Sequence, residues 1–360
     1  MPGACAPGIF VLRLKKKDVC VSNTTESLGH DAGLEADDAA DLDAGAAAVE
    51  LRSLQVTMAQ HGVRLDKALA DLVPEFSRSY LQQLLAQGAV GLNAKQVEKA
   101  SAKVKLGDVL TVEMRPTAQS QSFKPEVMAL DVVYEDAHLL VVNKPAGLVV
   151  HPAPGNWSGT LLNGLLAHHA GAALVPRAGI VHRLDKDTSG LMVVAKDRTT
   201  MDALVALIAQ RDVSRRYLAL AHQAWSGAEM KKVQAPIGRD PRNRLRMAVV
   251  DLAQHAGKAA ATDITCWDSQ GSYCLVHCKL HTGRTHQIRV HMLSLGHPLV
   301  ADALYGGAPA GGMQRQALHA FRLSFVHPVT GQLLELAAQP PADFLRAIEE
   351  LGLRYNPASQ

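Results

Sequence analysis

The sequence predicts an α+β protein in which a small mixed domain precedes a larger domain built on a largely antiparallel sheet. Its 360 residues are enough for about two domains, and a hydrophobic content of 48% supports a core in each. A polar segment that contains prolines, residues 115–125, separates two parts of different pattern. Beyond it, short apolar runs alternate with helical stretches, which favours a mixed sheet domain over a helical bundle.

The first 50 residues differ in composition from the rest. They hold nine Asp/Glu and four Lys/Arg, and no Lys or Arg occurs between residues 26 and 50. Such a segment cannot bury enough apolar surface to offset the entropy lost on ordering, so we predict a disordered acidic tail over 1–50. Residues 51–360 hold 33 Lys/Arg and 25 Asp/Glu, a net charge of +8. That excess suits a polyanionic partner.

The cysteines and the apolar runs indicate a protein of a reducing compartment without a membrane span. The five cysteines form no CxxC motif, and no apolar run approaches the ~20 residues that cross a bilayer. The apolar run at residues 9–12 is too short for a signal peptide and precedes its lysines. We therefore expect a cytoplasmic protein, a monomer, with no membrane partner.

Two of the cysteines raise the question of a metal site. Cys274 and Cys278 lie near His277 and His281, and all four are residue types that bind zinc. In a strand of period 2, however, the two thiols share an apolar face with Val276. We therefore predict core packing for both cysteines and no metal.

Residues 61–116 are expected to form the small domain. Three leucines recur at helical spacing within residues 65–72. A second helix is predicted from Ser77, its N-cap, to Gly88, its stop signal. Short strands follow within residues 89–112, with lysines between them. The pattern predicts two helices followed by strands, with basic residues along one side.

The larger domain is expected over residues 127–345, after a linker at 117–126 and before a C-terminal tail at 346–360. Its strands are predicted from apolar β-branched runs, and its helices from apolar residues at helical spacing. The predicted strands are 139–142, 191–195, 217–221, 275–280 and 333–337, and the predicted helices are 161–169, 201–210 and 285–295.

Four separated segments of this domain combine charged residues with turns. The most informative is HRLDKDTSG at 182–190, a charged loop that we expect between two buried strands, 180–181 and 191–195. Charges rarely lie beside core strands unless they are paired or used in function. Asp185 and Arg183 are therefore candidates for chemistry on a loop that rigid strands would hold.

The other three segments have the same character. NKPAGLVVHP at 143–152 predicts a strand, a tight turn and a second strand. SRRYLAL at 214–220 predicts a strand. In TGRTHQIRVH at 282–291, Gly283 can end a strand and Thr285 can cap a helix.

These segments carry two resemblances. RLD at 64–66, SRS at 77–79 and the residues from 88 to 108 resemble an S4 RNA-binding domain, which presents basic residues to RNA. The four charged segments, in their order and spacing over 127–340, resemble the RluA/RluD family of pseudouridine synthases. PIGR at 236–239 favours the RluD type, which modifies 23S rRNA. The resemblance implies the pseudouridine-synthase fold, with its largely antiparallel mixed sheet, after a small α/β S4 domain.

The resemblance implies an isomerisation without a cofactor. Uridine becomes its C-glycoside: the N1–C1′ bond breaks, the uracil rotates, and a C5–C1′ bond forms. Because atoms are only rearranged, neither a redox cofactor nor a metal is required. The implied partner is 23S rRNA or a precursor of the large subunit, with the helix 69 stem-loop as the expected target.

The resemblance also assigns the residues of the site. Asp185 is the implied catalytic carboxylate, and Arg289 can form a bidentate pair that keeps it ionised and directed. The carboxylate can attack uracil C6 or ribose C1′, or assist elimination to a glycal, and all three routes stay open. Tyr217 matches the tyrosine that stacks on uracil, and Ile288 is an apolar wall, although periodicity alone places both in the core. Arg183 helps to hold the base stack after the uridine is flipped out.

Basic residues of both domains are expected to contact the RNA. Four arginines within residues 239–246 could follow phosphates. Three alternatives stay open: an RNA-binding assembly factor without catalysis, a family member that acts on another rRNA or tRNA site, and a nucleoside hydrolase, which needs paired carboxylates. The predicted RNA contacts are Arg64, Arg78, Lys99, Arg239, Arg284 and His286.

Overall fold

The chain divides into two compact units in this computed structural model. Residues 21–124 form the smaller unit, and residues 1–20 together with 125–360 form the larger unit. The predicted Ser77 cap, most of the predicted acidic tail and the first half of the predicted linker lie outside the described residues. The described residues are 10–11, 15–16, 50–74, 78–97, 99–114, 122–153 and 155–356.

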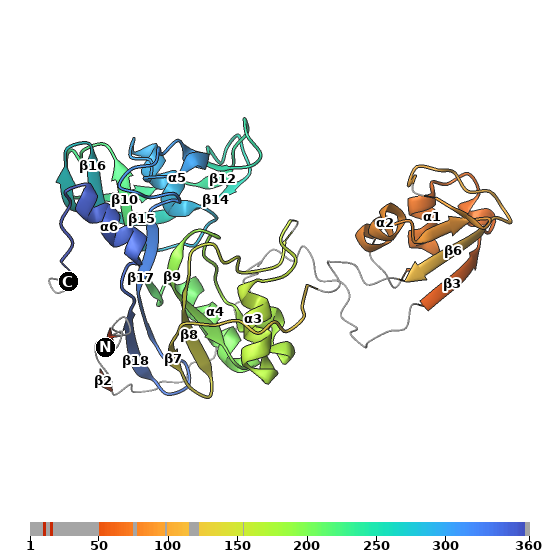
Figure 1. Ribbon diagram of the computed structural model, residues 1–360, viewed down its shortest axis with the longest axis horizontal. Coiled ribbons are helices and arrows are strands. Elements are labelled where there is room, and N and C mark those ends of the chain that lie inside the picture. The colour runs from red at the N-terminus through yellow and green to blue at the C-terminus, as the bar shows by residue number, and fades with distance from the viewer. Residues whose placement is uncertain are drawn as a thin grey trace, which may run out of the picture. The chain divides into compact units, whose positions relative to one another are not determined.

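The smaller unit packs two helices on a four-stranded antiparallel sheet (Figure 1). Helices α1 (Leu65–Leu72) and α2 (Arg78–Ala86) bury their leucines against Leu110 and Val112. Gly88 follows α2 with a φ of +67°, a conformation that glycine adopts without strain, so the predicted stop is confirmed. A 3-10 helix, η1 (Met58–Gln60), precedes α1. The strands, in spatial order, are β3 (Glu50–Gln55), β6 (Val109–Met114), β4 (Val90–Leu92) and β5 (Lys95–Gln96).

The larger unit is built on a sheet of eleven described strands (Figure 1). Only β9 and β17 run parallel, so the predicted, largely antiparallel sheet is confirmed. β18 (Gln332–Ala337) lies off the main path and pairs with β17. The strands of the path, in spatial order, are β11 (Met230–Gln234), β15 (Ala261–Gln270), β16 (Tyr273–Leu280), β10 (Ser214–His222), β17 (Leu318–Val326), β9 (Ser189–Ala195), β8 (Leu139–Lys144) and β7 (Val132–Glu135).

Two dipeptides of the predicted acidic tail belong to this sheet. β1 (Phe10–Val11) and β2 (Lys15–Lys16) pair antiparallel with β18. These four residues depart from the predicted disorder. A sheet edge offers unpaired backbone groups to any neighbouring segment, and backbone pairing does not depend on apolar composition.

The sheet is covered on both faces where it leads into the charged loop. All seven residues of β9 are buried, and they alternate between two cores: Met192 and Val194 face one, Leu191 and Val193 the other. Figure 1 shows α3 and α4 beside β7–β9. No helix in the described ranges is long and apolar enough to cross a membrane. The helices of this unit are α3 (Leu161–His168), α4 (Arg198–Gln210), α5 (Gln287–Ser294), α6 (Ala342–Glu350), and the 3-10 helices η2 (Ala170–Leu174), η3 (Pro176–Gly179) and η4 (Ala303–Tyr305).

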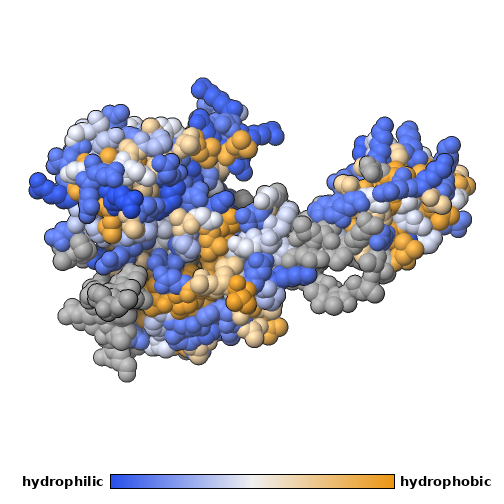
Figure 2. Space-filling view, in the orientation of Figure 1, coloured by the Kyte–Doolittle hydropathy of each residue, from blue (hydrophilic) through white to orange (hydrophobic). Residues whose placement is uncertain are grey.

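A separate three-stranded sheet carries the arginine-rich segment. It lies near α5 in Figure 1, and Figure 2 shows hydrophilic side chains beside apolar ones on this projecting part. Leu245 and Leu252 are exposed there. The strands, in spatial order, are β13 (Met247–Val249), β12 (Ile237–Arg239) and β14 (Gly257–Lys258).

Two strands predicted beside the charged segments do not form. Residues 180–181 are not a strand, because Ile180 makes only an isolated bridge to Val194. The second strand predicted within 143–152 is also absent from this described stretch. The carbonyls of Val149 and Val150 accept hydrogen bonds from the first amides of α3 instead. A helix N-terminus has free amides and can use an extended segment in this way.

The predicted cap of the last site helix is also wrong. α5 begins after His286, which has a φ of +56°, whereas Thr285 is exposed one residue earlier. The side chain of Gln287 stabilises this start, because its carbonyl oxygen accepts from the Arg284 amide at 3.0 Å. It also accepts from the Thr282 hydroxyl at 2.7 Å. A side chain of the first helical residue therefore replaces the expected cap.

Candidate active site

The loop that carries Asp185 is fixed where it enters β9. Gly190 has a φ of +116°, and a Cβ at this position would lie 2.2 Å from the carbonyl oxygen of Ala320. Only glycine allows β9 to approach β17 this closely. The neighbouring Ser189 hydroxyl contacts Nδ1 of His319 at 2.9 Å. The C-terminal end of the loop is therefore anchored to β17.

A buried lysine ties the same loop to the end of β8. Nζ of Lys144 donates to the carbonyls of Pro145, Leu148 and Lys186, each at 2.9 Å. The side chain is 1% exposed, and burial lowers the pKa of Lys144 to about 8, opposed by the charge of Asp187. Through these three backbone carbonyls, the lysine connects the turn that follows β8 to the charged loop.

The structure brings Asp185 and Arg289 together across 104 residues of sequence. Nη1 of Arg289 donates to Oδ2 of Asp185 at 2.9 Å. The predicted bidentate geometry of this pair is wrong, because Arg289 turns its fork to Asp302. Nε and Nη2 of Arg289 donate to the two carboxylate oxygens of Asp302 at 2.7 and 2.8 Å. Asp302 therefore sets the direction of the guanidinium. The third nitrogen of Arg289 is left to hold Asp185.

The cluster contains one cation and two carboxylates, with unequal exposure. The side chains of Asp302 and Arg289 are 1% and 7% exposed, whereas that of Asp185 is 19% exposed. Burial alone would lower the pKa of Arg289. The hydrogen bonds and charges of Asp302 and Asp185 outweigh the burial and raise the pKa of Arg289. Asp185 is thus the one carboxylate of the cluster that a substrate can reach.

His286 and Tyr305 border the cluster. Nε2 of His286 lies 3.9 Å from Oδ2 of Asp185, and its Nδ1 lies 2.8 Å from the Tyr305 hydroxyl. The guanidinium carbon of Arg289 lies 4.8 Å from the centre of the Tyr305 ring. Burial lowers the pKa of His286, and the charge of Asp185 opposes that shift. His286, predicted as an RNA contact, therefore lies beside the candidate carboxylate.

Tyr217 and Ile288 lie in the main core of the larger unit. They are 5% and 3% exposed and belong to one hydrophobic cluster. Burial raises the pKa of Tyr217 to about 12; the charge of Arg215 opposes the shift and that of Asp185 adds to it. The ring of Tyr217 is therefore part of the core, while its hydroxyl lies within the electrostatic reach of Asp185.

The three arginines of the larger unit that are predicted to contact RNA lie at its surface. Arg183, Arg239 and Arg284 are all exposed. Nε of Arg284 donates to the carbonyl of Ala259 at 3.2 Å, which anchors that loop without neutralising the charge. Exposed guanidinium groups of this kind can bind phosphates.

The predicted RNA contacts of the smaller unit share a buried partner. Nε of Arg64 and Nη2 of Arg78 lie 3.0 and 2.7 Å from the carboxylate of Asp66, which is 1% exposed. The hydrogen bonds from Arg78 and Arg64 hold the pKa of Asp66 well below its usual range. The two arginines are themselves more than half exposed, and Lys99 is also exposed. Asp66 therefore presents a fixed pair of cations.

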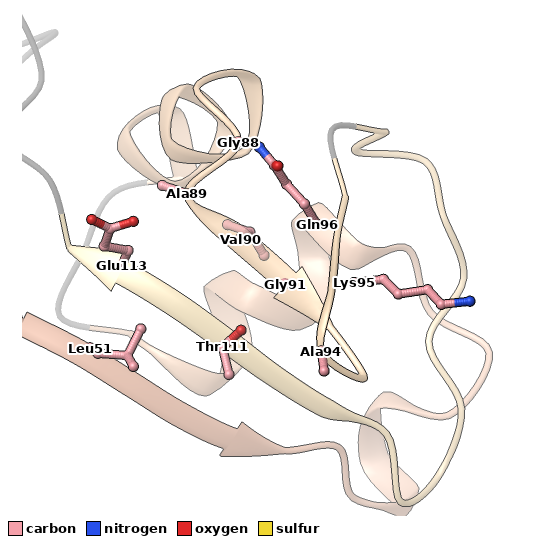
Figure 3. A pocket seen from close by; sticks show the side chains of 10 residues that line it. All are labelled: Leu51, Gly88, Ala89, Val90, Gly91, Ala94, Lys95, Gln96, Thr111 and Glu113. Atoms are coloured by element: carbon pink, nitrogen blue, oxygen red, sulfur yellow. The ribbon is translucent and has the colours of Figure 1, made fainter.

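The smaller unit also has a shallow hollow beside β4 and β6 (Figure 3). Its lining contains one cation, Lys95, and one anion, Glu113, at separated positions in Figure 3. Gly91 leaves room there, since a Cβ would lie 2.4 Å from the Thr111 hydroxyl. The hollow offers no cluster of reactive groups, so the candidate active site is the Asp185 cluster.

Asp302 and Tyr305 were missed from the sequence. Asp302 is a single carboxylate within an apolar run, residues 298–305, and it lacks the charged neighbours that mark the other segments. The available signal was this isolation, because a lone Asp in an apolar run is buried only when it is paired. Nothing in the local pattern names Arg289 as its partner.

The predicted core packing of Cys274 and Cys278 is confirmed. Cys274, Val276 and Cys278 are 0% exposed and belong to the same core as Tyr217. Burial raises the pKa of the Cys274 thiol to about 12, so it stays protonated and apolar in character. Among the described side chains, no group of three His, Cys, Asp or Glu residues converges to hold a metal ion.

Comparison with known proteins defines the class. Residues 138–294 match the RNA pseudouridylate synthase family, and residues 63–110 match the S4 domain. The first match contains Asp185, Tyr217 and Arg289. The fold and the sequence therefore define an RNA pseudouridine synthase, an isomerase that carries an S4 domain.

Individual relatives are similar over most of their length. The chain is 47% identical to ribosomal large subunit pseudouridine synthase D of Neisseria meningitidis serogroup B over 313 residues, 83% of this chain and 82% of the relative. It is 42% identical to the protein of the same name from Pasteurella multocida, over 84% of this chain and 95% of the relative. For the Nitrosomonas europaea protein of that name the identity is 45%, over 81% and 86%. The chain belongs to this family of pseudouridine synthases.

Proposed function

We propose that the protein isomerises uridines of 23S rRNA to pseudouridine, in the helix 69 stem-loop, with Asp185 as the catalytic carboxylate. The observation that carries this proposal is the 2.9 Å contact between Arg289 and a partly exposed Asp185. The target is supported by the relatives, which are named for the large ribosomal subunit. The RluD-type motifs of the sequence point to the same RNA.

Asp185 acts as the ionised group of the reaction. It attacks uracil C6 or ribose C1′, or assists elimination to a glycal, while the N1–C1′ bond breaks and the C5–C1′ bond forms. Arg289, directed by Asp302, holds the carboxylate by a hydrogen bond and aims it at the reacting atoms. Tyr217 offers the face of its ring and its hydroxyl to the uracil, and Ile288 closes the apolar side of the site.

The surrounding basic residues bind and open the RNA. Arg183 is exposed on the loop of Asp185 and holds the stack that the flipped uridine leaves. Contacts to phosphates come from Arg239 and Arg284 in the larger unit. Arg64, Arg78 and Lys99 supply them in the S4 domain, while His286 contacts the nucleotide beside Asp185. The protein acts in the cytoplasm, as a monomer and without a cofactor.

An Asp185→Asn variant tests the catalytic assignment. The amide keeps the size of the side chain but cannot serve as a carboxylate nucleophile or base. We expect it to fold and bind rRNA, yet to release tritium from [5-³H]uridine-labelled rRNA at least about 10⁴-fold more slowly than the wild type. Tritium release at the wild-type rate would contradict the assignment. Asp187→Asn, a carboxylate of the same loop, is the matched control and should keep most of the activity.

The target and the non-catalytic alternative need a second measurement. Pseudouridines are mapped in 23S rRNA from a strain that lacks the gene and from one complemented with it. We expect the helix 69 pseudouridines to be absent from the first strain and restored in the second. Loss at another rRNA or tRNA position would correct the target. An unchanged map, with no tritium release by the wild type, would favour an assembly factor without catalysis.

A further inference from the structure

A second buried arginine, Arg215, lies beside the candidate site and has no partner among the described residues. Arg215 stands on β10 two residues before Tyr217, so the two side chains share one face of the strand. The arginine is 6% exposed. Its position is about 7 Å from Tyr217 along the strand, which is within the span of one nucleotide bound at the site.

The guanidinium of Arg215 has no protein acceptor in the described ranges. Its Nε is inaccessible to solvent and makes no hydrogen bond, and no carboxylate of those ranges lies within ion-pair distance of Arg215. Arg289, by contrast, is 6% exposed and satisfies its three nitrogens with two carboxylates. A buried charge without a partner lowers stability, so proteins keep one where function needs it.

A neighbour of Arg215, His182, also has a buried nitrogen without a hydrogen-bond partner among the described residues. Nε2 of His182 accepts a hydrogen bond from the Val193 amide at 3.1 Å, so the neutral ring carries its proton on Nδ1, which is buried and has no acceptor in the described part of the chain. Burial and then the charge of Arg215 lower the pKa of His182 to about 3. Two buried donors, Nε of Arg215 and Nδ1 of His182, therefore lack an acceptor among the described residues, and the two side chains lie within electrostatic reach of each other.

The loop that leads to α5 leaves space for this guanidinium. A Cβ at Gly283 would lie 2.8 Å from Nη1 of Arg215. Gly283 is exposed and precedes Arg284, so the inner end of the guanidinium is buried while its tip reaches a surface loop of the site. The tip of the arginine is thus placed where an RNA strand that enters the site can reach it.

We propose that Arg215 is a substrate-binding residue that takes a phosphate oxygen of the nucleotide entering the site. This inference rests on RNA being the substrate of the Asp185 cluster. A phosphate supplies the negative charge that the buried guanidinium lacks, and its oxygens match the guanidinium fork. A uracil carbonyl would give one hydrogen bond but would leave the buried charge uncompensated.

The first test compares Arg215→Met with Arg216→Met. Both variants remove one positive charge, but Arg216 lies on the opposite face of β10. For a 23S rRNA fragment that the wild type modifies, we expect Arg215→Met to bind about 10- to 100-fold more weakly. Its log–log salt slope should fall by about 0.7, the value of one phosphate contact to a single strand. Arg216→Met should change neither quantity measurably.

Thermal unfolding separates binding from a structural role. Because Arg215→Met removes an unpaired buried charge, we expect its melting temperature to equal or exceed that of the wild type. A lower melting temperature with a parallel loss of affinity would overturn the proposal and assign Arg215 to the core. Wild-type affinity and salt slope in Arg215→Met would overturn it as well. Failure of the wild type to modify any 23S rRNA fragment would instead reject the proposed function.

The second test identifies the acceptor. Methylphosphonate groups, which carry no charge, replace the phosphates on the 5′ and 3′ sides of the target uridine in turn. We expect one replacement to weaken binding by the wild type but not by Arg215→Met, because the partner of that phosphate is already gone. Equal sensitivity of both proteins at both positions would overturn the phosphate in favour of a base carbonyl. Gly283→Ala, which keeps the charge but displaces Nη1, should weaken binding by an intermediate factor.

Discussion

The two units use the same chemistry in opposite proportion. In the larger unit one arginine, Arg289, lies between two carboxylates, and the exposed member is Asp185. In the smaller unit one carboxylate, Asp66, lies between two arginines, and the exposed members are Arg64 and Arg78. In each cluster the buried groups hold the direction of the exposed ones. The charge that reaches the surface is negative in the first and positive in the second.

This difference explains how one chain can bind a polyanion and still expose an anion to it. A carboxylate near phosphates would be repelled unless a cation offset its charge. Arg289, which is more buried than Asp185, supplies that cation. The S4 cluster has no reacting group to protect, so its carboxylate is buried and both cations face outward. The buried carboxylate of each cluster, Asp302 in the larger unit and Asp66 in the smaller, therefore positions the other groups. Its substitution tests the comparison.

Among the substitutions that test this comparison, the largest effect is expected from Asp302→Asn. An amide cannot act as a charged partner of Arg289, so the guanidinium can turn toward Asp185 and misdirect its carboxylate. We expect kcat for tritium release to fall about 10²-fold, with KM almost unchanged. Kinetics on labelled rRNA measure both, with Asp187→Asn as the control. A kcat within twofold of the wild type would show that Asp302 does not position the site.

A smaller effect is expected from Asp66→Asn. The change in affinity should be opposite in sign to what the change in net charge alone would give. The variant adds one net positive charge, yet it frees Arg64 and Arg78 from their fixed direction. We expect rRNA to bind about 3- to 10-fold more weakly, because mobile arginines lose entropy when they bind phosphates. Filter binding at fixed salt measures the affinity. Asp71→Asn, an exposed carboxylate of the same helix, makes the same charge change and is the matched control. Tighter binding by Asp66→Asn would mean that net charge alone decides.

The smallest effect is a difference in acid sensitivity between the units. Burial lowers the pKa of His319 to about 4 and that of His182 to about 3, so the unfolded chain takes up these protons first. The stability of the larger unit must therefore fall as the pH drops below about 6.5. The lowered pKa of Asp66 leaves its contribution intact until the pH falls below about 4.

Calorimetry between pH 7 and pH 4.5 tests this difference. We expect the transition of the larger unit to fall by roughly 5–10 °C, while that of the smaller unit moves less. His319→Asn should reduce the shift of the larger unit. Equal shifts of the two transitions would contradict the assignment to buried histidines.

Much of the fold follows from local patterns that the sequence displays. The strands at 139–142, 191–195 and 275–280 were predicted from apolar runs, and each lies within an observed strand. The apolar face of Cys274 and Cys278 follows from period 2 in the same way. The failures lie where a short run has two possible partners. Residues 180–181 are apolar and β-branched, yet the neighbouring positions of the sheet are taken by other strands.

The sequence by itself singled out Asp185 as a candidate for chemistry, because a charged turn beside apolar strands is costly unless it is paired or used. The family resemblance named Arg289 as the partner of Asp185, although 104 residues separate the two. Only the tertiary structure decided which charges meet. It gave the fork of Arg289 to Asp302, joined Arg64 and Arg78 through Asp66, and left Arg215 buried without a protein acceptor in the described ranges. The physical reason is that pairing depends on distance and direction in space, and the periodicity of a chain specifies only which face a side chain occupies.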